Sequence, residues 1–453
     1  GGYSSSIISG EKTENRRGPN NDYWIVKLNA DGSIAWQKTI GGDLEDEFTE
    51  IHQTSDGGFI CGGYSNSNIS GDKTENNRGS SNGCDYWVIK LNATGDIVWQ
   101  KTIGGSGNDR LYTIKQTTDG GYILGGASNS GISGEKTGNN RGAPITTDYW
   151  VLKLNATGDI IWQKTIGGSD FDDLNSVQQT NDGGYILAGR SYSNISGEKT
   201  ENYRGSTSNY DYWVVKLNVN GTIVWQKTIG GSDDDGLQSI QQTSDSGYIL
   251  GGWSKSNISG EKTENARNFA DWDYWIVKLN VTGNLVWQKT IGGGLGSSTL
   301  NSIKQTSDKG YILAGYSFCN AGSEKTENGR GEYDYWVVKI KLISDPNSIA
   351  GRVYITKNNN CIQEINESGK SNIVVQTQNN GYFGISDSLG KYNIITDTGT
   401  YKVRQIIPVI LKPLFNGGLV CPTLGYHTVS FSQYGQDTSE INFATYEKQC
   451  AFL

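Results

Sequence analysis

The phrase Asp-Tyr-Trp recurs six times along the chain, and its spacing limits what the chain can fold into. Successive tryptophans of this phrase are separated by 63, 63, 63, 62 and 61 residues. A period this regular indicates an array of similar units, each of which buries its apolar face by packing against its neighbours. The tryptophans are Trp24, Trp87, Trp150, Trp213, Trp275 and Trp336.

Each unit is predicted to contain four short strands. In one unit we expect them at residues 111–117, 121–128, 148–155 and 159–166, with an Asp119-Gly120 turn joining the first two. The third strand alternates with period two, which is the pattern of a β-strand. Four antiparallel strands repeated about six times are typical of a β-propeller.

Composition agrees with this prediction and excludes some partners. The 453 residues include 62 glycines, 25 tyrosines and 13 tryptophans, which favours short strands joined by tight turns. The net charge is −8, and acidic and basic residues are interspersed, so we expect no nucleic-acid partner. No apolar run is long enough to predict a membrane span.

Two features of the repeat resemble known propeller families. The double glycine that closes the second strand resembles kelch repeats, and the Tyr-Trp strand followed by a tryptophan-bearing strand resembles quinoprotein-type repeats. Both resemblances concern the fold alone. We therefore expect an all-β chain with a propeller over residues 1–342. The opening GGYSSS resembles the end of a second strand, so we expect an N-terminally truncated propeller of six four-stranded blades, or of seven if more was lost.

The phrase ISGEKTEN and its variants occupy the long loop between the second and third strands of each unit. Acidic turns between units are predicted on the same face, which therefore becomes the candidate binding face for a protein, a glycan or divalent cations. The competing interpretation is a ring of ion-paired clasps between neighbouring units, and the uniformity of the phrase favours it. Gly138 and the shortened phrase at 322–328 are the exceptions where we expect a ligand. The candidate residues of this face are Glu11, Lys12, Arg17, Asp46, Asp109, Asp172, Glu198, Lys199, Arg204 and Asp235.

Catalysis has little support in the sequence. The two histidines, His52 and His427, form no catalytic set with a serine and an aspartate, and His52 stands where other units carry lysine or glutamine. Acidic pairs suited to glycoside hydrolysis are plentiful, but nothing selects one of them. We therefore predict a protein without enzymatic activity. Calcium at the acidic turns is weakly indicated, because the turn at 292–298 has no acid.

Composition changes at residues 343–348, which we predict to be a linker. The following residues, 349–445, resemble the SD-repeat B-like domains of bacterial surface adhesins and related carboxypeptidase-regulatory modules. The matching pieces are GRVY, SNIVVQT and GKYNIITDTGTYKV. The resemblance implies an immunoglobulin-like β-sandwich, and residues 446–453 would begin a further segment. A disulfide involving Cys361 and Cys421 is an option whose pairing stays open.

The same resemblance implies a Ca²⁺ loop at residues 356–367. In that family such loops bind Ca²⁺ in the manner of an EF-hand. Here Thr356 stands where the family has its first aspartate and Cys361 where it has glycine, so we expect binding to be weakened or absent. Otherwise we expect no cofactor. The carried-over ligands are Asn358, Asn360, Glu364 and Glu367 through their side chains and Ile362 through its carbonyl.

The combination of propeller and module resembles large secreted or surface proteins of Bacteroidota exported by type IX secretion. This resemblance implies an extracellular location and outer-membrane secretion components among the partners. We therefore expect a non-enzymatic adhesion protein, with the propeller as a platform for a protein or a glycan and the sandwich as a spacer. The alternatives are a structural or cargo component of a secretion or motility assembly, and a propeller-based enzyme acting on polysaccharides.

Overall fold

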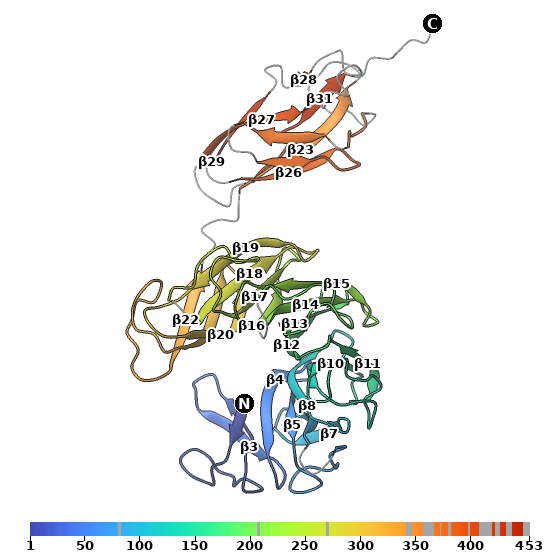
Figure 1. Ribbon diagram of the computed structural model, residues 1–453, viewed down its shortest axis with the longest axis vertical. Helices are drawn as coiled ribbons and strands as arrows, with labels where there is room; N and C mark the ends of the chain where they lie inside the picture. The colour runs from blue at the N-terminus through green and yellow to red at the C-terminus, as the bar shows by residue number, and fades with distance from the viewer. Residues whose placement is uncertain are drawn as a thin grey trace. The chain divides into compact units, whose positions relative to one another are not determined.

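A computed structural model describes residues 1–79, 83–205, 209–268, 271–340, 347–356, 367–371, 373–378, 382–396, 399–406, 419–421, 426–431 and 437–446. The chain divides into two compact units, Gly1–Ile340 and Lys341–Leu453 (Figure 1). Every regular element in the described residues is a β-strand. The all-β prediction is therefore confirmed for this part of the chain.

The first unit contains six antiparallel sheets in chain order, which we call blades. Blade 1 has three strands, β1 (Gly2–Ser4), β2 (Asp22–Leu28) and β3 (Ile34–Ile40). Blade 2 has β4 (Asp46–Gln53), β5 (Phe59–Ser65), β6 (Asp85–Leu91) and β7 (Ile97–Ile103). Blade 3 has β8 (Asp109–Gln116), β9 (Tyr122–Ser128), β10 (Asp148–Leu154) and β11 (Ile160–Ile166).

The remaining blades repeat this order. Blade 4 has β12 (Asp172–Gln179), β13 (Tyr185–Ser191), β14 (Asp211–Leu217) and β15 (Ile223–Ile229). Blade 5 has β16 (Asp235–Gln242), β17 (Tyr248–Ser254), β18 (Asp273–Leu279) and β19 (Leu285–Ile291). Blade 6 has three strands, β20 (Ser298–Gln305), β21 (Tyr311–Ser317) and β22 (Asp334–Ile340). Repeated blades of this kind make the first unit a propeller-type fold.

The predicted strands agree with the observed ones to within two residues. In blade 3, the tight turn between β8 and β9 places Gly120 at φ +81°, a backbone region that favours glycine. Each blade is a meander, so its long loop and its connection to the next blade emerge at the same end. The predicted common face of long loops and connections is therefore confirmed.

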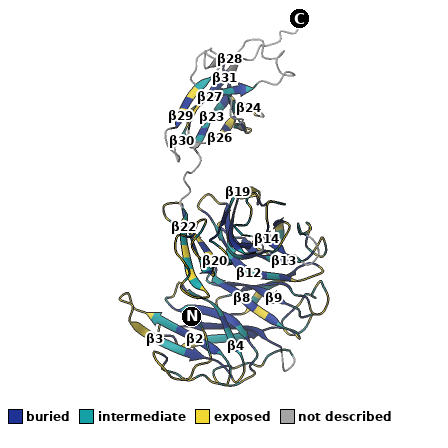
Figure 2. Cartoon of the chain, turned by 60° about the vertical axis from the view of Figure 1, so that its left-hand side comes forward, coloured by how far each residue is buried: buried dark blue, intermediate teal, exposed yellow. Residues whose placement is uncertain are grey.

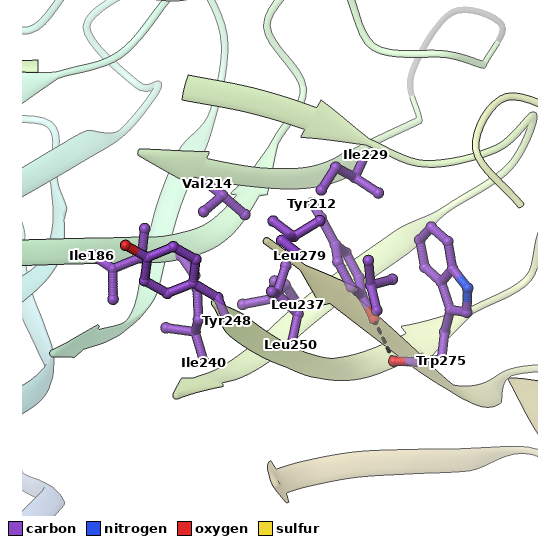
Figure 3. Packing of buried hydrophobic residues seen from close by; sticks show 12 residues of the cluster. Ile186, Tyr212, Val214, Ile229, Leu237, Ile240, Tyr248, Leu250, Trp275 and Leu279 are labelled. Atoms are coloured by element: carbon purple, nitrogen blue, oxygen red, sulfur yellow. Dashed lines mark hydrogen bonds between the residues drawn. The ribbon is translucent and has the colours of Figure 1, made fainter. Parts of the chain in front are cut away.

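The apolar core lies between neighbouring blades. In Figure 3, Tyr212 of β14 reaches across to blade 5, where its hydroxyl donates to the backbone carbonyl of Trp275 at 3.1 Å. Both side chains are fully buried. The tryptophans near the start of the fourth strands also contact the next blade, since the ring of Trp99 lies 5.8 Å from that of Tyr122. Tryptophans of the third and fourth strands therefore pack between neighbouring blades.

The first strands of blades 2 to 6 lie side by side and line one cavity of about 440 Å³. Strands of the middle blades are mostly buried, whereas β22 alternates between exposed and half-buried residues (Figure 2). Cys61 is fully buried in β5.

The second unit is a sandwich of two sheets around one core. One sheet has the order β26–β23–β31–β28, with β30 paired to β23, and the other has the order β25–β24–β27–β29. Buried residues from both sheets, including Ile349 and Val403, form a single cluster. Two pairings, β23 with β30 and β23 with β31, are parallel. β23 begins inside the segment predicted as a linker. The strands are β23 (Asn347–Thr356), β24 (Val374–Thr377), β25 (Phe383–Ile385), β26 (Lys391–Thr396), β27 (Gly399–Ile406), β28 (Leu419–Cys421), β29 (His427–Phe431), β30 (Asp437–Thr438) and β31 (Phe443–Tyr446).

Candidate functional site

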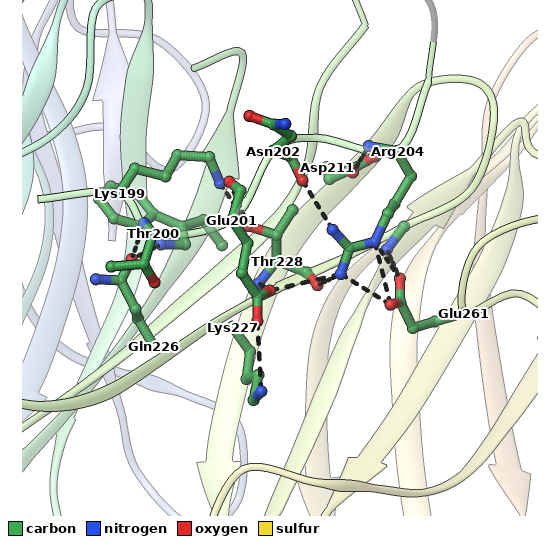
Figure 4. Close-up of polar contacts among 12 residues, drawn as sticks. Lys199, Thr200, Glu201, Asn202, Arg204, Asp211, Gln226, Lys227, Thr228 and Glu261 are labelled. Atoms are coloured by element: carbon green, nitrogen blue, oxygen red, sulfur yellow. Dashed lines mark hydrogen bonds and ion pairs between the residues drawn. The ribbon is translucent and has the colours of Figure 1, made fainter. Parts of the chain in front are cut away.

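The repeated ISGEKTEN loops join each blade to the next. In Figure 4, the guanidinium of Arg204 in blade 4 contacts the carboxylate of Glu261 in blade 5, with Nη2 2.9 Å from Oε1. Arg204 also donates to the backbone carbonyls of Asn202 and Thr228, at 2.8 and 3.0 Å. The interpretation of these loops as clasps is therefore confirmed for the arginine and the acid. The equivalent pairs are Arg17–Asp72, Arg78–Glu135, Arg141–Glu198 and Arg267–Glu324.

The lysine of the phrase has a different role from the one predicted. Lys12 and Lys199 are buried, and their ammonium groups donate to Thr39 at 3.0 Å and to Thr228 at 2.5 Å. Burial lowers the pKa of Lys199 to about 8. Both side chains are enclosed within their own blades, so neither is offered to a partner on the surface. Glu11, by contrast, is exposed in blade 1.

The aspartates predicted to line this face are also buried, which corrects that expectation. Asp109, for example, accepts hydrogen bonds from the backbone N–H of Gly105 at 2.6 Å and from the hydroxyl of Ser130 at 2.9 Å. Each of these carboxylates closes the turn that follows the two glycines at the end of a fourth strand. The aspartates therefore lie at the predicted end of the blade, but their side chains point inward. The four residues are Asp46, Asp109, Asp172 and Asp235, each fully buried.

Most of the proposed Ca²⁺ loop, with Asn358, Asn360, Ile362 and Glu364, lies outside the described residues. Glu367 is described and is buried. Cys361 also lies outside them, so the disulfide stays a prediction. Among the described residues, no group of three or more histidines, cysteines, aspartates or glutamates is arranged to hold a metal ion.

Comparison of the blades with one another separates positions that build the fold from positions that vary. The second position of the first strand is Glu47, Arg110, Asp173, Gly236 or Thr299. The residue directly across from it in the second strand is Tyr64, Ala127, Arg190, Trp253 or Tyr316. Four further positions vary as widely. They are those of Asn108, Tyr112, Asn129 and Thr147 in blade 3.

The variable positions of blades 3 and 4 meet in one pocket of about 470 Å³ between the two blades. Ten of its eleven lining residues occupy variable positions, and the eleventh, Ile145, belongs to the loop at 132–147. Ala127 opens this pocket, because the equivalent positions of the other five blades hold tyrosine, arginine or tryptophan. We call it the interblade pocket. Its lining residues are Asn108, Arg110, Tyr112, Ala127, Asn129, Ile145, Thr147, Phe171, Asp173, Arg190 and Tyr192.

Hydrogen bonds and one ion pair hold the blade 4 side of the interblade pocket in place. Arg190 contacts Asp173 through Nε and Nη2, at 3.1 and 2.9 Å from Oδ2. The hydroxyl of Thr147 in blade 3 donates to the other carboxylate oxygen at 2.7 Å. Asp173 is thus bound from both blades. The guanidinium of Arg190 also stacks on the ring of Tyr210, 5.4 Å from its centroid, so its orientation is fixed.

Aromatic side chains form the rim of the interblade pocket. Phe171 is 37 % exposed, and its ring centroid lies 6.2 Å from that of Tyr192. Tyr192 in turn packs on Tyr210, with the centroids 4.6 Å apart. Burial, and then the charge of Asp173, raise the pKa of Tyr112, so its phenol stays protonated at neutral pH and can donate a hydrogen bond.

The cavity among the first strands carries a second polar cluster. Glu50 accepts hydrogen bonds from the hydroxyl of Thr113 at 2.9 Å and from the ammonium of Lys115 at 3.0 Å, and its carboxylate lies 2.8 Å from Nε2 of His52. Burial opposes ionisation, but the hydrogen bond with His52 and the charge of Lys115 lower the pKa of Glu50 to about 2. The charges of this cluster are therefore satisfied within the protein.

The sequence pointed to the interblade pocket only through its loop and through the acidic turns between units, which include Asp173. Gly138 was predicted as an exception to the repeated phrase, and its loop at 132–147 supplies Ile145. Arg110, Ala127 and Phe171 were not predicted. Aligning the repeats and selecting the positions that differ between blades would have found them, because repeated phrases such as ISGEKTEN hold the blades together and the pocket residues do not repeat.

The sequence matches no protein-family profile. A curated relative, the regulatory protein FlaEY of Caulobacter vibrioides, is 22 % identical over an alignment of 334 residues that covers 68 % of this chain and 33 % of the relative. The chain thus spans about a third of the length of that protein.

In the described residues, no helix is long and apolar enough to cross a membrane.

Solved structures with some likeness include a GH43 enzyme of Xanthomonas citri, 11 % identical, covering 65 % of this chain and 86 % of that one, at a TM-score of 0.32. Another is BamB of Moraxella catarrhalis, 15 % identical, covering 64 % and 86 %, at a TM-score of 0.25. A third is the PQQ domain of pyranose dehydrogenase from Coprinopsis cinerea, 10 % identical, covering 82 % and 87 %, at 0.28. At these values the likenesses assign neither an activity nor a partner to this chain.

Proposed function

We propose that the first unit is a non-enzymatic recognition module of an extracellular surface protein, and that its partner, a protein or a glycan, binds at the interblade pocket. One observation carries this proposal: ten of eleven pocket residues occupy positions that vary between blades. Within one chain, positions needed for the fold repeat in every blade, so a cluster of unlike residues at one place favours a role outside folding.

The chemistry of the pocket supports recognition. The carboxylate of Asp173 is bound by Arg190 and by Thr147, so this side chain forms a fixed part of the pocket wall. Exposed aromatic rings beside arginine are the side chains enriched at binding surfaces. In this proposal the second unit is an immunoglobulin-like spacer of the SD-repeat B-like kind, and the protein is a type IX secretion cargo of a Bacteroidota cell surface.

A matched pair of variants tests the proposal. Ala127→Tyr fills the pocket with the residue that Tyr64 provides in blade 2, so the fold is expected to tolerate it. Ile258→Ala changes a residue of the blade 5 loop on the same face, 62 % exposed and outside the pocket. The full chain and both variants are immobilised and screened against a glycan array and a panel of extracellular proteins. We expect at least one ligand that Ala127→Tyr no longer binds and that Ile258→Ala still binds.

Two results would overturn the proposal. If every ligand that binds the wild-type chain also binds Ala127→Tyr, the partner does not use this pocket. If the wild-type chain cleaves a polysaccharide of the array and Ala127→Tyr does not, the pocket is an active site and the protein is an enzyme.

A further inference from the structure

We propose that the interblade pocket selects acidic oligosaccharides, with Arg110 binding the carboxylate of a uronic acid residue. This inference rests on the function proposed above and names the class of ligand. Its starting point is a charge imbalance. The pocket contains two arginines and one aspartate, so its formal charge is 2 − 1 = +1, within a chain of net charge −8.

The positive charge that is left over belongs to Arg110. Arg190 is ion-paired with Asp173, whereas no carboxylate of the described residues lies within ion-pair distance of Arg110. The guanidinium of Arg110 instead stacks on Tyr64 of blade 2, 5.7 Å from the ring centroid, and interacts with the side chains of Cys84 and Tyr112. The stack holds the planar group in place while leaving the residue exposed. A guanidinium presented in this way matches the two oxygens of a carboxylate.

The neighbours of Arg110 favour a single negative charge. Asp173 lies in the same pocket, and its carboxylate would repel a dianion more strongly than a monoanion. A carboxylate carries one charge, which balances the charge of Arg110. A phosphate monoester carries close to two at neutral pH.

The rest of the lining suits a sugar. Hydroxyl and amide groups of Tyr112, Asn108, Asn129 and Thr147 can exchange hydrogen bonds with sugar hydroxyls, and the exposed ring of Phe171 offers an apolar face. The volume of about 470 Å³ lies within the range of about 300–1,000 Å³ typical of small-molecule sites. A folded protein partner needs instead a contact of about 800 Å² per side. A concave pocket therefore favours the end of an oligosaccharide over a protein surface.

The test uses the full chain and an acid trimer, a galactose trisaccharide that ends in one galacturonic acid residue, with calorimetry as the readout. Three comparison sugars accompany it: the fully methyl-esterified trimer, a neutral galactose trimer and a sulfated galactose trimer. We expect the acid trimer to bind at least about tenfold more tightly than the ester and the neutral sugar, because both lack the charge that Arg110 binds. We expect Arg110→Ala to remove this preference and Arg110→Lys to retain part of it.

Arg330→Ala serves as the control, since Arg330 in blade 6 is equally an exposed arginine. A loss of binding in Arg330→Ala with no loss in Arg110→Ala would overturn the assignment, and so would equal binding of the ester. Tighter binding of the sulfated trimer would overturn the choice of a carboxylate. If Ala127→Tyr loses another ligand found in the array screen while the acid trimer never binds, the inference falls and the proposed function stands. Tryptophan fluorescence verifies that each variant is folded.

Discussion

Tyr149 of blade 3 donates its hydroxyl hydrogen to the backbone carbonyl of Trp213 in blade 4, and the two oxygen atoms lie 3.0 Å apart. The two rings also pack together, with centroids 4.8 Å apart, and both residues are fully buried. The tyrosine and the tryptophan come from the same repeated phrase, so each copy of the phrase contacts the next. Each repeat therefore binds the next repeat along the array through the same phrase.

Removing this hydroxyl tests how strongly the contact stabilises the array. Tyr149→Phe keeps the ring and deletes one buried hydrogen bond, so we expect a loss of about 1 kcal/mol in the free energy of unfolding. Urea unfolding followed by tryptophan fluorescence measures it, because all 13 tryptophans lie in the first unit. Tyr335→Phe is the control, since Tyr335 is 97 % exposed and its change should have no effect. Equal effects of the two changes would contradict this account.

The arginine clasps should contribute little individually. The side chains of Arg204 and Glu261 are 27 % and 29 % exposed, so solvent screens their attraction. A double-mutant cycle of Arg204→Ala and Glu261→Ala is expected to give a coupling energy of about 0.5–1 kcal/mol that decreases as salt is added. The same cycle on Arg330 and Glu327, 83 % and 77 % exposed, should give no measurable coupling. A coupling energy that does not respond to salt would show that the Arg204 pair acts mainly through packing.

Much of the architecture could be predicted because the same strand pattern occurs six times in the sequence. The Asp-Tyr-Trp spacing gives the blade size, and alternation within residues 148–155 gives a strand close to the observed β10. Side-chain direction at the strand ends was less accessible. Asp109 begins β8 and Lys199 lies in the long loop, and both are charged, so they were expected to be exposed. Their hydrogen bonds with Gly105 and Ser130, and with Thr228, hold them in buried positions.

The candidate site could be predicted only in part, because it depends on which residues of two different blades face one another. Arg110 and Phe171 are 61 residues apart, and neither stands in a recognisable motif. The small side chain of Ala127 indicates a pocket only when the positions of the aromatic residues around it are known. The antiparallel register of β8 and β9 sets Arg110 opposite Ala127, and the small side chain at this place leaves the space of the pocket.

Buried aspartates at the start of the third strands should make the first unit less stable as the pH rises from 5 to 8. Burial raises the pKa of Asp85 to about 7 from 3.8 in the unfolded chain, and the nearby carboxyl of Asp109 acts in the same direction. The backbone N–H of Arg78 and the charges of Lys73 and Arg78 oppose this shift. Between these two pKa values the folded state binds more protons than the unfolded state. The contribution of Asp85 to the free energy of unfolding is therefore fully present below about pH 4, and it is lost as the pH rises through about 7.

The thermal midpoint of the tryptophan signal, measured from pH 5 to 8, checks this expectation. Asp85→Asn has no proton to lose, so the stability difference between variant and wild type should shift in favour of the variant as the pH rises. Asp170→Asn changes an exposed aspartate in the connection between β11 and β12 and should show no such trend. If Asp85→Asn and wild type keep a constant difference over this range, Asp85 does not titrate there.

The edge strand β22 should accept an added strand with the sequence of β19. In blades 1 to 5 the indole N–H of the repeat tryptophan donates to a glutamine of the fourth strand, as Trp275 does to Gln288 at 2.8 Å. Blade 6 has three strands, and in the described residues Trp336 has no such glutamine. A peptide of residues 285–294 would place its glutamine opposite Val338 and its threonine opposite Trp336, following the register of β18 and β19. At tenfold excess over its dissociation constant it should stabilise the unit by about 1.4 kcal/mol.

A rise in the thermal midpoint and a change in fluorescence on adding the peptide would support this expectation. The control peptide carries alanine in place of the residues equivalent to Gln288 and Thr290, so it keeps the strand pattern but cannot accept from Trp336 or from Lys325. The ammonium of Lys325 now donates to Ser317 at 3.1 Å and to the carbonyl of Cys319 at 2.6 Å. In the other blades the equivalent lysine donates to the threonine of the fourth strand, as Lys262 does to Thr290 at 2.8 Å. If both peptides stabilise the unit equally, β22 binds any extended chain, and these two contacts do not select its partner.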